Sequence, residues 1–258
     1  MTGRERAEFR KQANGLEPVF QIGKGDIGDA MIDAIDAALQ KRELIKLAVL
    51  DTSGLTAHGG GGRVRTDGEG SVFVEVTVFY RPLPDGAECG ARGALLSAAL
   101  GEERAARLLY APGGKPFIAP AADDPRPPYM SLTHTRALIA CAVCRAPVGL
   151  DAEPAERAVP EALARRILSA AERARCAALP EGARAAFLLD VWVAKEAHLK
   201  RTGEGLAGGM ARLTVAPGGR VLAGDGRPLG HVRPVALPGA RAAVAAQAAA
   251  IAVAVRRI

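Results

Sequence analysis

Three side chains that could act together in catalysis share one face of a predicted helix. Residues 187–200 have helical periodicity, and Trp192, Glu196 and Lys200 recur at i, i+4 spacing, away from the apolar side. A carboxylate and an ammonium group on one helix face have two interpretations. Either they form an exposed pair that stabilises the helix by about 0.2–0.5 kcal/mol, or they belong to a site that segments further upstream complete.

Two further carboxylates have the spacing of a cation site. Residues 148–153 are predicted to form a strand, in which Asp151 and Glu153 point to the same face because side chains repeat every second residue. Carboxylates this close raise one another's pKa unless a cation lies between them. Magnesium prefers oxygen ligands and commonly binds one or two carboxylates together with substrate phosphates. We therefore expect Mg²⁺ at this strand.

A polar run before a buried strand offers donors for a phosphate. Residues 131–135 precede the apolar run 137–143 and place His134 between Thr133 and Thr135. A single histidine beside an apolar run is usually a core or surface residue. Here, however, two hydroxyl groups and an imidazole together provide the donors that a phosphate site needs.

Four short motifs follow one another along residues 114–200. They are Gly114-Lys-Pro116, Ser131-Leu-Thr-His-Thr135, Gly149-Leu-Asp-Ala-Glu153 and Trp192-Val-Ala-Lys-Glu-Ala-His-Leu-Lys200. In this order and at these separations they resemble the Sfp-type phosphopantetheinyl transferases, whose pattern reads G-K-P, S-x-S/T-H-S/T, G-[ILV]-D-x-E and W-x-x-K-E-x-x-x-K. The resemblance covers about residues 71–258. It implies a pseudo-twofold α+β fold with two subdomains, about 71–147 and 148–258.

The resemblance also implies an activity. The chain would transfer the 4′-phosphopantetheine group of coenzyme A to a serine of an apo acyl or peptidyl carrier protein, in a magnesium-dependent reaction. The carrier serine would attack the β-phosphate, and adenosine 3′,5′-bisphosphate would leave. Lys115, Thr133 and His134 would bind coenzyme A, with His134 at the 3′-phosphate.

Further roles follow from the same resemblance. Arg92 begins a helical run near the nucleotide and is either a phosphate contact or an exposed arginine. Glu196 would complete the metal site with Asp151 and Glu153, and it is the candidate for taking the serine proton. Lys200 would offset charge on the attacking or leaving oxygen.

The first fifty residues carry a different pattern. A basic helical run, 3–14, is followed by a strand-like segment ending in Gly23-Lys-Gly25, an amphipathic helix from Asp26 and a second strand, 43–50. The signatures resemble the CRM RNA-binding family, whose small bacterial members associate with the assembling large ribosomal subunit. They are Arg10-Lys-Gln-Ala13, Pro18-Val-Phe-Gln-Ile-Gly23 and Glu43-Leu-Ile-Lys46.

The CRM-like unit is expected to be a truncated α/β domain over residues 1–55. The glycine run after His58 predicts a linker, 56–70, to the transferase domain, 71–258, and we assign the predicted strand 71–81 to the second domain.

An RNA contact, with ribosomal RNA as the expected partner, would use the glycine turn and its Lys24, because backbone amides there can approach a phosphate closely. Further contacts would come from Arg6, Arg10 and Lys11. Asp26 stands where the family has a second glycine. Its negative charge would repel RNA, and its side chain could instead form the N-cap of the following helix. The unit is therefore either RNA-binding or merely structural. The alternative function for the whole chain is an RNA-binding ribosome-assembly protein with an inactive transferase-like scaffold.

Composition indicates the kind of partner, the state of the cysteines and the cellular compartment. A net charge of +6 favours an anionic partner, and four cysteines are too few for a disulfide framework. Cys141 and Cys144 form a single C-x-x-C inside an apolar run, which favours buried thiols over a metal or redox site. No secretory signal or membrane-spanning run is evident. We expect a cytoplasmic monomer that does not bind membranes.

Overall fold

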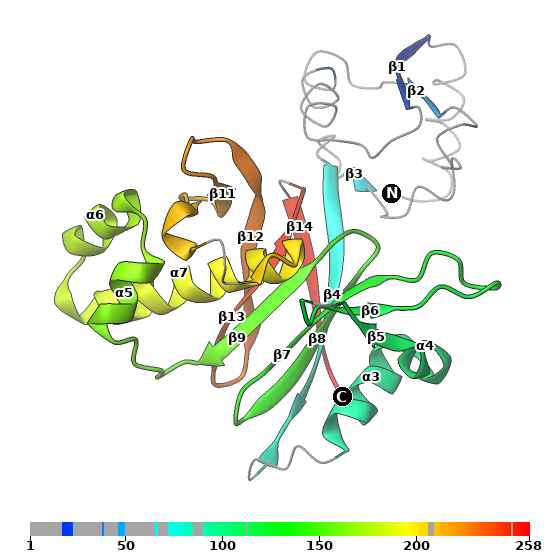
Figure 1. Ribbon diagram of the computed structural model, residues 1–258, viewed down its shortest axis with the longest axis horizontal. Coiled ribbons are helices and arrows are strands. Elements are labelled where there is room, and N and C mark those ends of the chain that lie inside the picture. The colour runs from blue at the N-terminus through cyan, green and yellow to red at the C-terminus, as the bar shows by residue number, and fades with distance from the viewer. Residues whose placement is uncertain are drawn as a thin grey trace. The chain divides into compact units, whose positions relative to one another are not determined.

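The computed structural model describes residues 17–22, 38, 46–49, 65–66, 72–84, 90–111, 113–205, 209–248 and 250–258 (Figure 1). The chain divides into two compact units, residues 1–73 and 74–258. In the first unit, β1 (Pro18–Ile22) and β2 (Lys46–Val49) pair in parallel, at the two positions where the pattern predicts strands. A short strand, β3 (Arg65–Thr66), lies within the segment predicted to be a linker.

One sheet of the second unit has the strand order β14-β4-β8-β7. Its strands are β4 (Val72–Pro82), β7 (Tyr129–His134), β8 (Leu138–Cys144) and β14 (Ala250–Arg257). The predicted strand 71–81 is thus observed as β4, and its antiparallel pairing with β8 makes it part of the second unit. The C-terminal strand β14 returns to this sheet, so the predicted boundary near residue 147 does not separate the two sheets completely.

A helix and a hairpin flank the first sheet. On α3 (Ala91–Leu100), Leu95 packs with Met130, Ile139 and Cys141 in a buried apolar cluster. After α4 (Glu102–Ala106), the hairpin of β5 (Leu108–Tyr110) and β6 (Pro116–Ile118) leads the chain back toward β7.

The second sheet is antiparallel, with the order β10-β11-β12-β13-β9. Its strands are β9 (Gly149–Pro154), β10 (Thr214–Val215), β11 (Arg220–Leu222), β12 (Pro228–Leu237) and β13 (Ala240–Ala246). Between β9 and β10 the chain forms α5 (Glu161–Ile167), α6 (Ala170–Ala178), α7 (Glu181–Thr202) and the 3₁₀ turn η4 (Met210–Arg212). Figure 1 shows the long helix α7 lying across this sheet.

Alanines on β13 explain how the layers approach one another. Ala242, Val244 and Ala246 face a core that contains Val78 and Ala140 of the first sheet. The alternate residues Ala243 and Ala245 face the other way, against Val193 and Ala197 of α7. A strand that is apolar on both faces is buried between two layers, so β13 and α7 form the centre of the second half of the unit.

The mixture of helices and antiparallel sheets confirms the predicted α+β class. Cys141 and Cys144 are buried, and burial raises the pKa of Cys141 to about 12, so the thiol stays protonated. None of the helices within the described residues is long and apolar enough to cross a membrane.

Candidate active site

A glycine sets the distance between β9 and α7. A Cβ built on Gly149 would lie 1.8 Å from the carbonyl oxygen of Ala197 and 2.6 Å from the amide nitrogen of Arg201. Only glycine fits at so close a backbone approach. Because α7 rests directly on the start of β9, the side chain two residues further along the strand, Asp151, comes within reach of the last turns of the helix.

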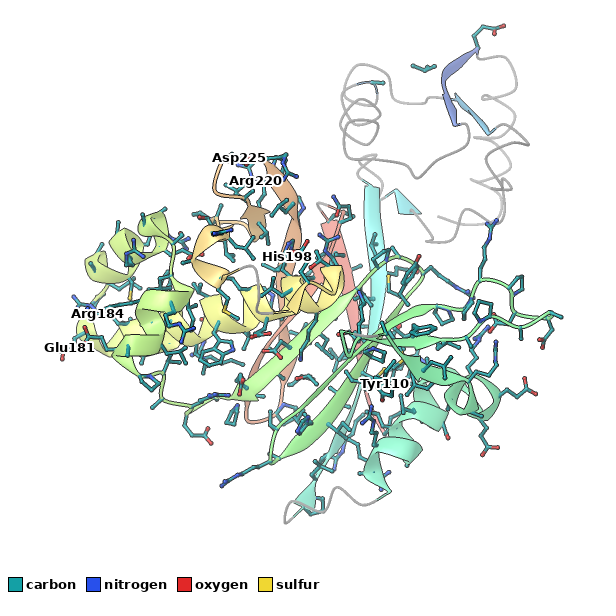
Figure 2. All side chains as sticks on the ribbon, in the orientation of Figure 1. Tyr110, Glu181, Arg184, His198, Arg220 and Asp225 are labelled. Carbon is teal, nitrogen blue, oxygen red and sulfur yellow. The ribbon has the colours of Figure 1, made fainter. Side chains whose placement is uncertain are left out.

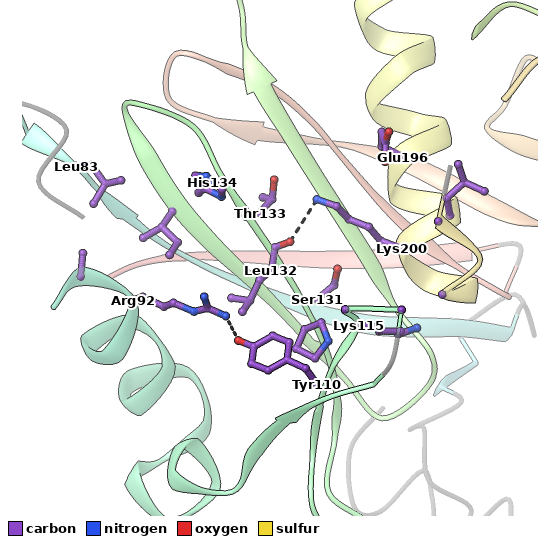
Figure 3. A pocket seen from close by; sticks show the side chains of 18 residues that line it. Leu83, Arg92, Tyr110, Lys115, Ser131, Leu132, Thr133, His134, Glu196 and Lys200 are labelled. Carbon is purple, nitrogen blue, oxygen red and sulfur yellow. Dashed lines mark hydrogen bonds between the residues drawn. The ribbon is translucent and has the colours of Figure 1, made fainter. Parts of the chain in front are cut away.

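Asp151 and Lys200 meet at this contact. The Lys200 ammonium donates to Asp151 Oδ1 at 2.6 Å and to the carbonyl oxygen of Leu132 at 3.3 Å, and Figure 3 shows it extending from α7 toward β7. Asp151 Oδ2 is buried without a hydrogen-bond partner among the described residues. The sequence predicted both residues for the site, and α7, β7 and β9 bring them together.

The hydroxyl groups of the 131–135 motif join the two sheets. Ser131 Oγ accepts from the amide of Leu150 at 2.9 Å, and Thr133 Oγ1 accepts from the amide of Ala152 at 3.1 Å. Both hydroxyls lie on β7, an edge strand of the first sheet, and both acceptors bind amides of β9, an edge strand of the second. Thr135 Oγ1 accepts from the amides of residues 137 and 138 within its own turn. These hydroxyls therefore have structural partners, and His134 remains as the exposed polar side chain of the motif.

A cavity of about 490 Å³ opens between α3, the β5–β6 hairpin, β7 and the end of α7 (Figure 3). Its volume lies in the range of about 300–1,000 Å³ that ligand pockets have. Six residues predicted for cofactor binding or catalysis contribute to its wall, namely Arg92, Lys115, Thr133, His134, Glu196 and Lys200. Segments that are about 100 residues apart in the chain thus meet around one space.

The carboxylates beside the cavity are electrostatically coupled. Burial, the charge of Asp151 and the charge of Glu153 all raise the pKa of Glu196, which Lys200 partly offsets. Burial also raises the pKa of Asp151, against the opposing effect of Lys200. Within the described residues the Glu196 side chain has no hydrogen-bond or ion-pair partner, so it is a carboxylate held beside other negative charge at the cavity wall.

Glu153 is paired with an arginine of the protein. Its carboxylate forms an ion pair with Arg157 at 2.5 Å, and no group of three or more His, Cys, Asp or Glu side chains in the described part of the chain is arranged to hold a metal ion as it stands. Glu196 lines the cavity, Asp151 is buried and binds Lys200 of the cavity wall, and Glu153 pairs with Arg157. The three predicted metal ligands thus lie on β9 and α7, and within the described residues their carboxylates do not form a group that could hold a metal ion as they stand.

The other predicted cofactor residues also have partners in the chain. The Lys115 ammonium donates to the carbonyl oxygen of Arg201 at the end of α7, and burial followed by the charge of Arg201 lowers the pKa of Lys115. Arg92 donates to the hydroxyl of Tyr110 across the cavity, as Figure 3 shows. Tyr110 is a cavity residue that the sequence analysis did not select, because a tyrosine in a three-residue strand carries no spacing signal.

Lys195, next to Glu196 in the chain, lies on a different face of α7. It is fully buried and donates to Glu172 at 2.5 Å and to the carbonyl oxygens of Ile167 and Met210 at 2.7 and 3.0 Å. His198, labelled in Figure 2, is also buried away from the cavity wall, and burial together with Arg201 lowers its pKa to about 4. One helix therefore carries a structural lysine and a cavity lysine.

The residues predicted to bind RNA, Arg6, Arg10, Lys11 and Lys24, lie outside the described residues, as does Asp26.

Comparison with known proteins identifies both parts of the chain. Residues 147–223 match the family model of the 4′-phosphopantetheinyl transferase superfamily, and residues 1–60 match that of the CRS1 / YhbY (CRM) domain. Over 50 residues the chain is 48% identical to the "Probable RNA-binding protein YqeI" of Bacillus subtilis (strain 168); this match covers 19% of the chain and 52% of that relative. Both family resemblances are confirmed.

The transferase match contains the metal and catalytic candidates but not the whole cavity. Asp151, Glu153, Glu196 and Lys200 fall within residues 147–223. The motifs with Lys115 and His134 precede that segment, and the cavity links them to it.

Proposed function

We propose that the second unit transfers 4′-phosphopantetheine from coenzyme A to a serine of an apo acyl or peptidyl carrier protein. One observation carries the proposal. In a chain with a domain of the 4′-phosphopantetheinyl transferase superfamily, the cations Arg92 and Lys115, the imidazole of His134 and the pair of Glu196 and Lys200 line a single cavity. Cations and a carboxylate around one space suit a phosphorylated substrate and a proton to be removed.

The nucleotide would occupy the part of the cavity between α3 and the β5–β6 hairpin. Arg92, Lys115 and His134 would contact its phosphates. The ammonium group of Lys115 is held there by the carbonyl oxygen of Arg201 at the C-terminal end of α7. Tyr110 is 50% exposed, and its ring offers a flat apolar surface on which a nucleobase can stack.

A Mg²⁺ ion would bind near the last turns of α7, where the carboxylates of Asp151, Glu153 and Glu196 lie. Asp151 Oδ2 is a buried oxygen without a partner in the described part of the chain, and Glu196 is a second carboxylate coupled to it. These two residues would hold the ion, with Glu153 as a third ligand. A bound Mg²⁺ would neutralise charge on the pyrophosphate.

Glu196 is the proposed proton acceptor. It lies at the cavity wall one helical turn from Lys200, and one of its two oxygens would stay free to take the serine proton while the other holds the cation. Lys200, anchored by Asp151 and Leu132, would stabilise charge that develops on the attacking or leaving oxygen.

Intact mass spectrometry tests the activity. The full chain is incubated with coenzyme A, Mg²⁺ and a panel of apo carrier proteins from fatty-acid and secondary-product synthases. We expect one carrier or more to gain the mass of one phosphopantetheine, and Glu196→Gln to abolish the gain while circular dichroism stays unchanged. No mass gain on any carrier, or normal labelling by the variant, would overturn the activity or the role of Glu196 respectively.

A second function, RNA binding, is supported for the first unit. Residues 1–60 match the CRM domain, and the relative that shares this region is named as a probable RNA-binding protein. We infer that the chain binds RNA through this unit, with Arg6, Arg10, Lys11 and Lys24 contacting phosphates. Co-sedimentation of the full chain with ribosomal particles tests the inference. Binding without transferase activity would instead support an RNA-binding protein with an inactive scaffold.

A further inference from the structure

Arg157 is fixed between β9 and α7 by two interactions. Its guanidinium forms the 2.5 Å ion pair with Glu153 and lies 4.5 Å from the centroid of the Trp192 ring. A guanidinium within about 6 Å of an indole face is attracted by the ring's negative charge density. Trp192, which also packs against the apolar cluster around Leu188 and Val191, thus contacts the cation that binds Glu153.

This pair is close to the carboxylates of the cavity. Trp192 lies one turn before Glu196 on the same face of α7, and Glu153 lies two residues after Asp151 on β9. The charge of Glu153 contributes to raising the pKa of both Asp151 and Glu196. Glu153 is therefore electrostatically part of the cluster, although its carboxylate is paired with an arginine.

Two of the predicted metal ligands, Asp151 and Glu153, each form an ion pair with a cationic side chain of the protein. Lys200 binds Asp151 through one oxygen only and leaves Oδ2 without a partner in the described residues. Arg157 binds Glu153, whose side chain is 17% exposed against 41% for the arginine. A divalent cation at this site would bind the second oxygen of Asp151, which Lys200 does not use, and would have to compete with Arg157 for Glu153.

We propose that Arg157, held by Trp192, is a positioning residue that competes with the divalent cation for Glu153 and thereby lowers the affinity of the site for that cation. The inference rests on the proposed function, because it assumes a cation site at Asp151 and Glu196. It makes Glu153 a ligand whose availability depends on a neighbouring arginine.

Mn²⁺ binding to the full chain tests the proposal, by isothermal titration calorimetry and by the electron paramagnetic resonance signal of free Mn²⁺. Removing Arg157 in Arg157→Gln should tighten the dissociation constant about two- to fivefold, the effect of losing a partly exposed ion pair. Trp192→Phe, which weakens the stacking, should tighten it by less.

Arg241→Gln is the matched control. Arg241 lies opposite Glu153 in the β9–β13 register, but its guanidinium pairs with Asp190 at 2.7 Å, so the variant removes one positive charge nearby without freeing Glu153. Its Mn²⁺ affinity should stay within about twofold of the parent chain. Equal tightening in Arg157→Gln and Arg241→Gln, or weaker binding in Arg157→Gln, would overturn the proposal.

Carrier labelling measured on the same samples separates this inference from the proposed function. If the parent chain labels a carrier and Arg157→Gln binds Mn²⁺ no more tightly, the proposed transferase activity stands and the proposed role of Arg157 is wrong. If Arg157→Gln binds Mn²⁺ more tightly but no sample labels a carrier, the role of Arg157 stands and the proposed activity is wrong. No Mn²⁺ binding in any variant rejects the inference, whatever the labelling shows.

Discussion

Helix α7 carries two lysine–carboxylate pairs that differ in how completely they are satisfied. Lys195 and Glu172 are both 0% exposed; the lysine has three acceptors, and Glu172 also accepts from the amides of Ser169 and Val215 at 2.7 Å. Lys200 and Asp151 are 33% and 7% exposed, and Asp151 Oδ2 has no hydrogen-bond partner in the described residues.

The difference separates a pair whose hydrogen bonds are all used from a pair that keeps one oxygen without a partner in the described residues. The Glu172 pair connects α6, α7, η4 and β10 with every strong donor and acceptor used, which is how a buried ion pair is tolerated. The Asp151 pair lies next to a cavity and keeps unused capacity for a ligand. Residue type alone would not distinguish them, whereas burial and unused hydrogen-bonding capacity do.

The largest expected effect is on the structural pair. Lys195→Ala leaves the buried Glu172 carboxylate without its cation and should cost about 3–5 kcal/mol of unfolding free energy. Urea unfolding followed by the fluorescence of Trp192, the single tryptophan, measures it. The double variant Lys195→Met with Glu172→Gln should recover part of the loss, because neither charge remains. A stability within 1 kcal/mol of the parent in Lys195→Ala would show that the two pairs are not different in kind.

The pair of Lys200 and Asp151, which we propose to act in catalysis, should respond in the opposite way. Lys200→Met is expected to slow carrier labelling about 10²–10³-fold, the cost of losing a preorganised charge-stabilising donor, with a nearly unchanged circular dichroism spectrum. Arg165→Ala is the control, because it removes a cation from the exposed pair with Glu161. Its labelling rate should match that of the parent. An unfolded Lys200→Met would make Lys200 structural as well.

Gly149 allows β9 to pack closely on α7, and this contact brings Asp151 to Lys200. Gly149→Ala would place a methyl group 1.8 Å from a helix carbonyl, and the separation of strand and helix needed to relieve it should cost about 1–3 kcal/mol and much of the labelling rate. Gly182→Ala, at a helical glycine with open space around its Cβ position, should be neutral or stabilising. Thermal unfolding compares the two. Equal melting temperatures in both variants would disprove the tight contact.

The smallest effect concerns pH. Because the folded-state pKa of Glu196 is raised, its ionised form costs stability above the ordinary pKa of 4.5, and the cost disappears as pH falls below that value. Glu196→Gln should therefore raise the melting temperature by about 1–3 °C at pH 7, with a difference that shrinks toward pH 4. A melting temperature that falls in the variant at pH 7 would contradict the assignment of Glu196 as a destabilising carboxylate.

Sequence reasoning predicted the parts of the site that depend on spacing. The period-two spacing of Asp151 and Glu153 and the i, i+4 spacing of Glu196 and Lys200 are both observed on β9 and α7. It could not predict that the hydroxyls of Ser131 and Thr133 join two sheets, because strands 131–134 and 149–154 become neighbours only through tertiary packing. Tyr110 was missed because a three-residue strand gives no spacing from which its side chain could be assigned to the cavity.

The arginine-rich segment 162–179 shows the same limit. Its charge pattern has two interpretations from the sequence alone, a surface that attracts an acidic acyl carrier protein or a solvated helix face. In the structure Arg173 and Arg175 donate to the carbonyl oxygens of Leu168 and Val215, as Arg184, labelled in Figure 2, does to Leu179 near the start of α7. Neither interpretation anticipates these backbone contacts, whereas Arg165, which is 76% exposed in its pair with Glu161, fits a solvated helix face.

A crystal structure of the full chain with coenzyme A and Mn²⁺ tests the central claim most directly, since Mn²⁺ is located by its anomalous scattering. The account predicts an anomalous peak in contact with Asp151 Oδ2 and Glu196, with the pyrophosphate beside it and the nucleotide in the cavity near Arg92 and His134. A peak away from both carboxylates, or coenzyme A bound outside the cavity, would contradict it.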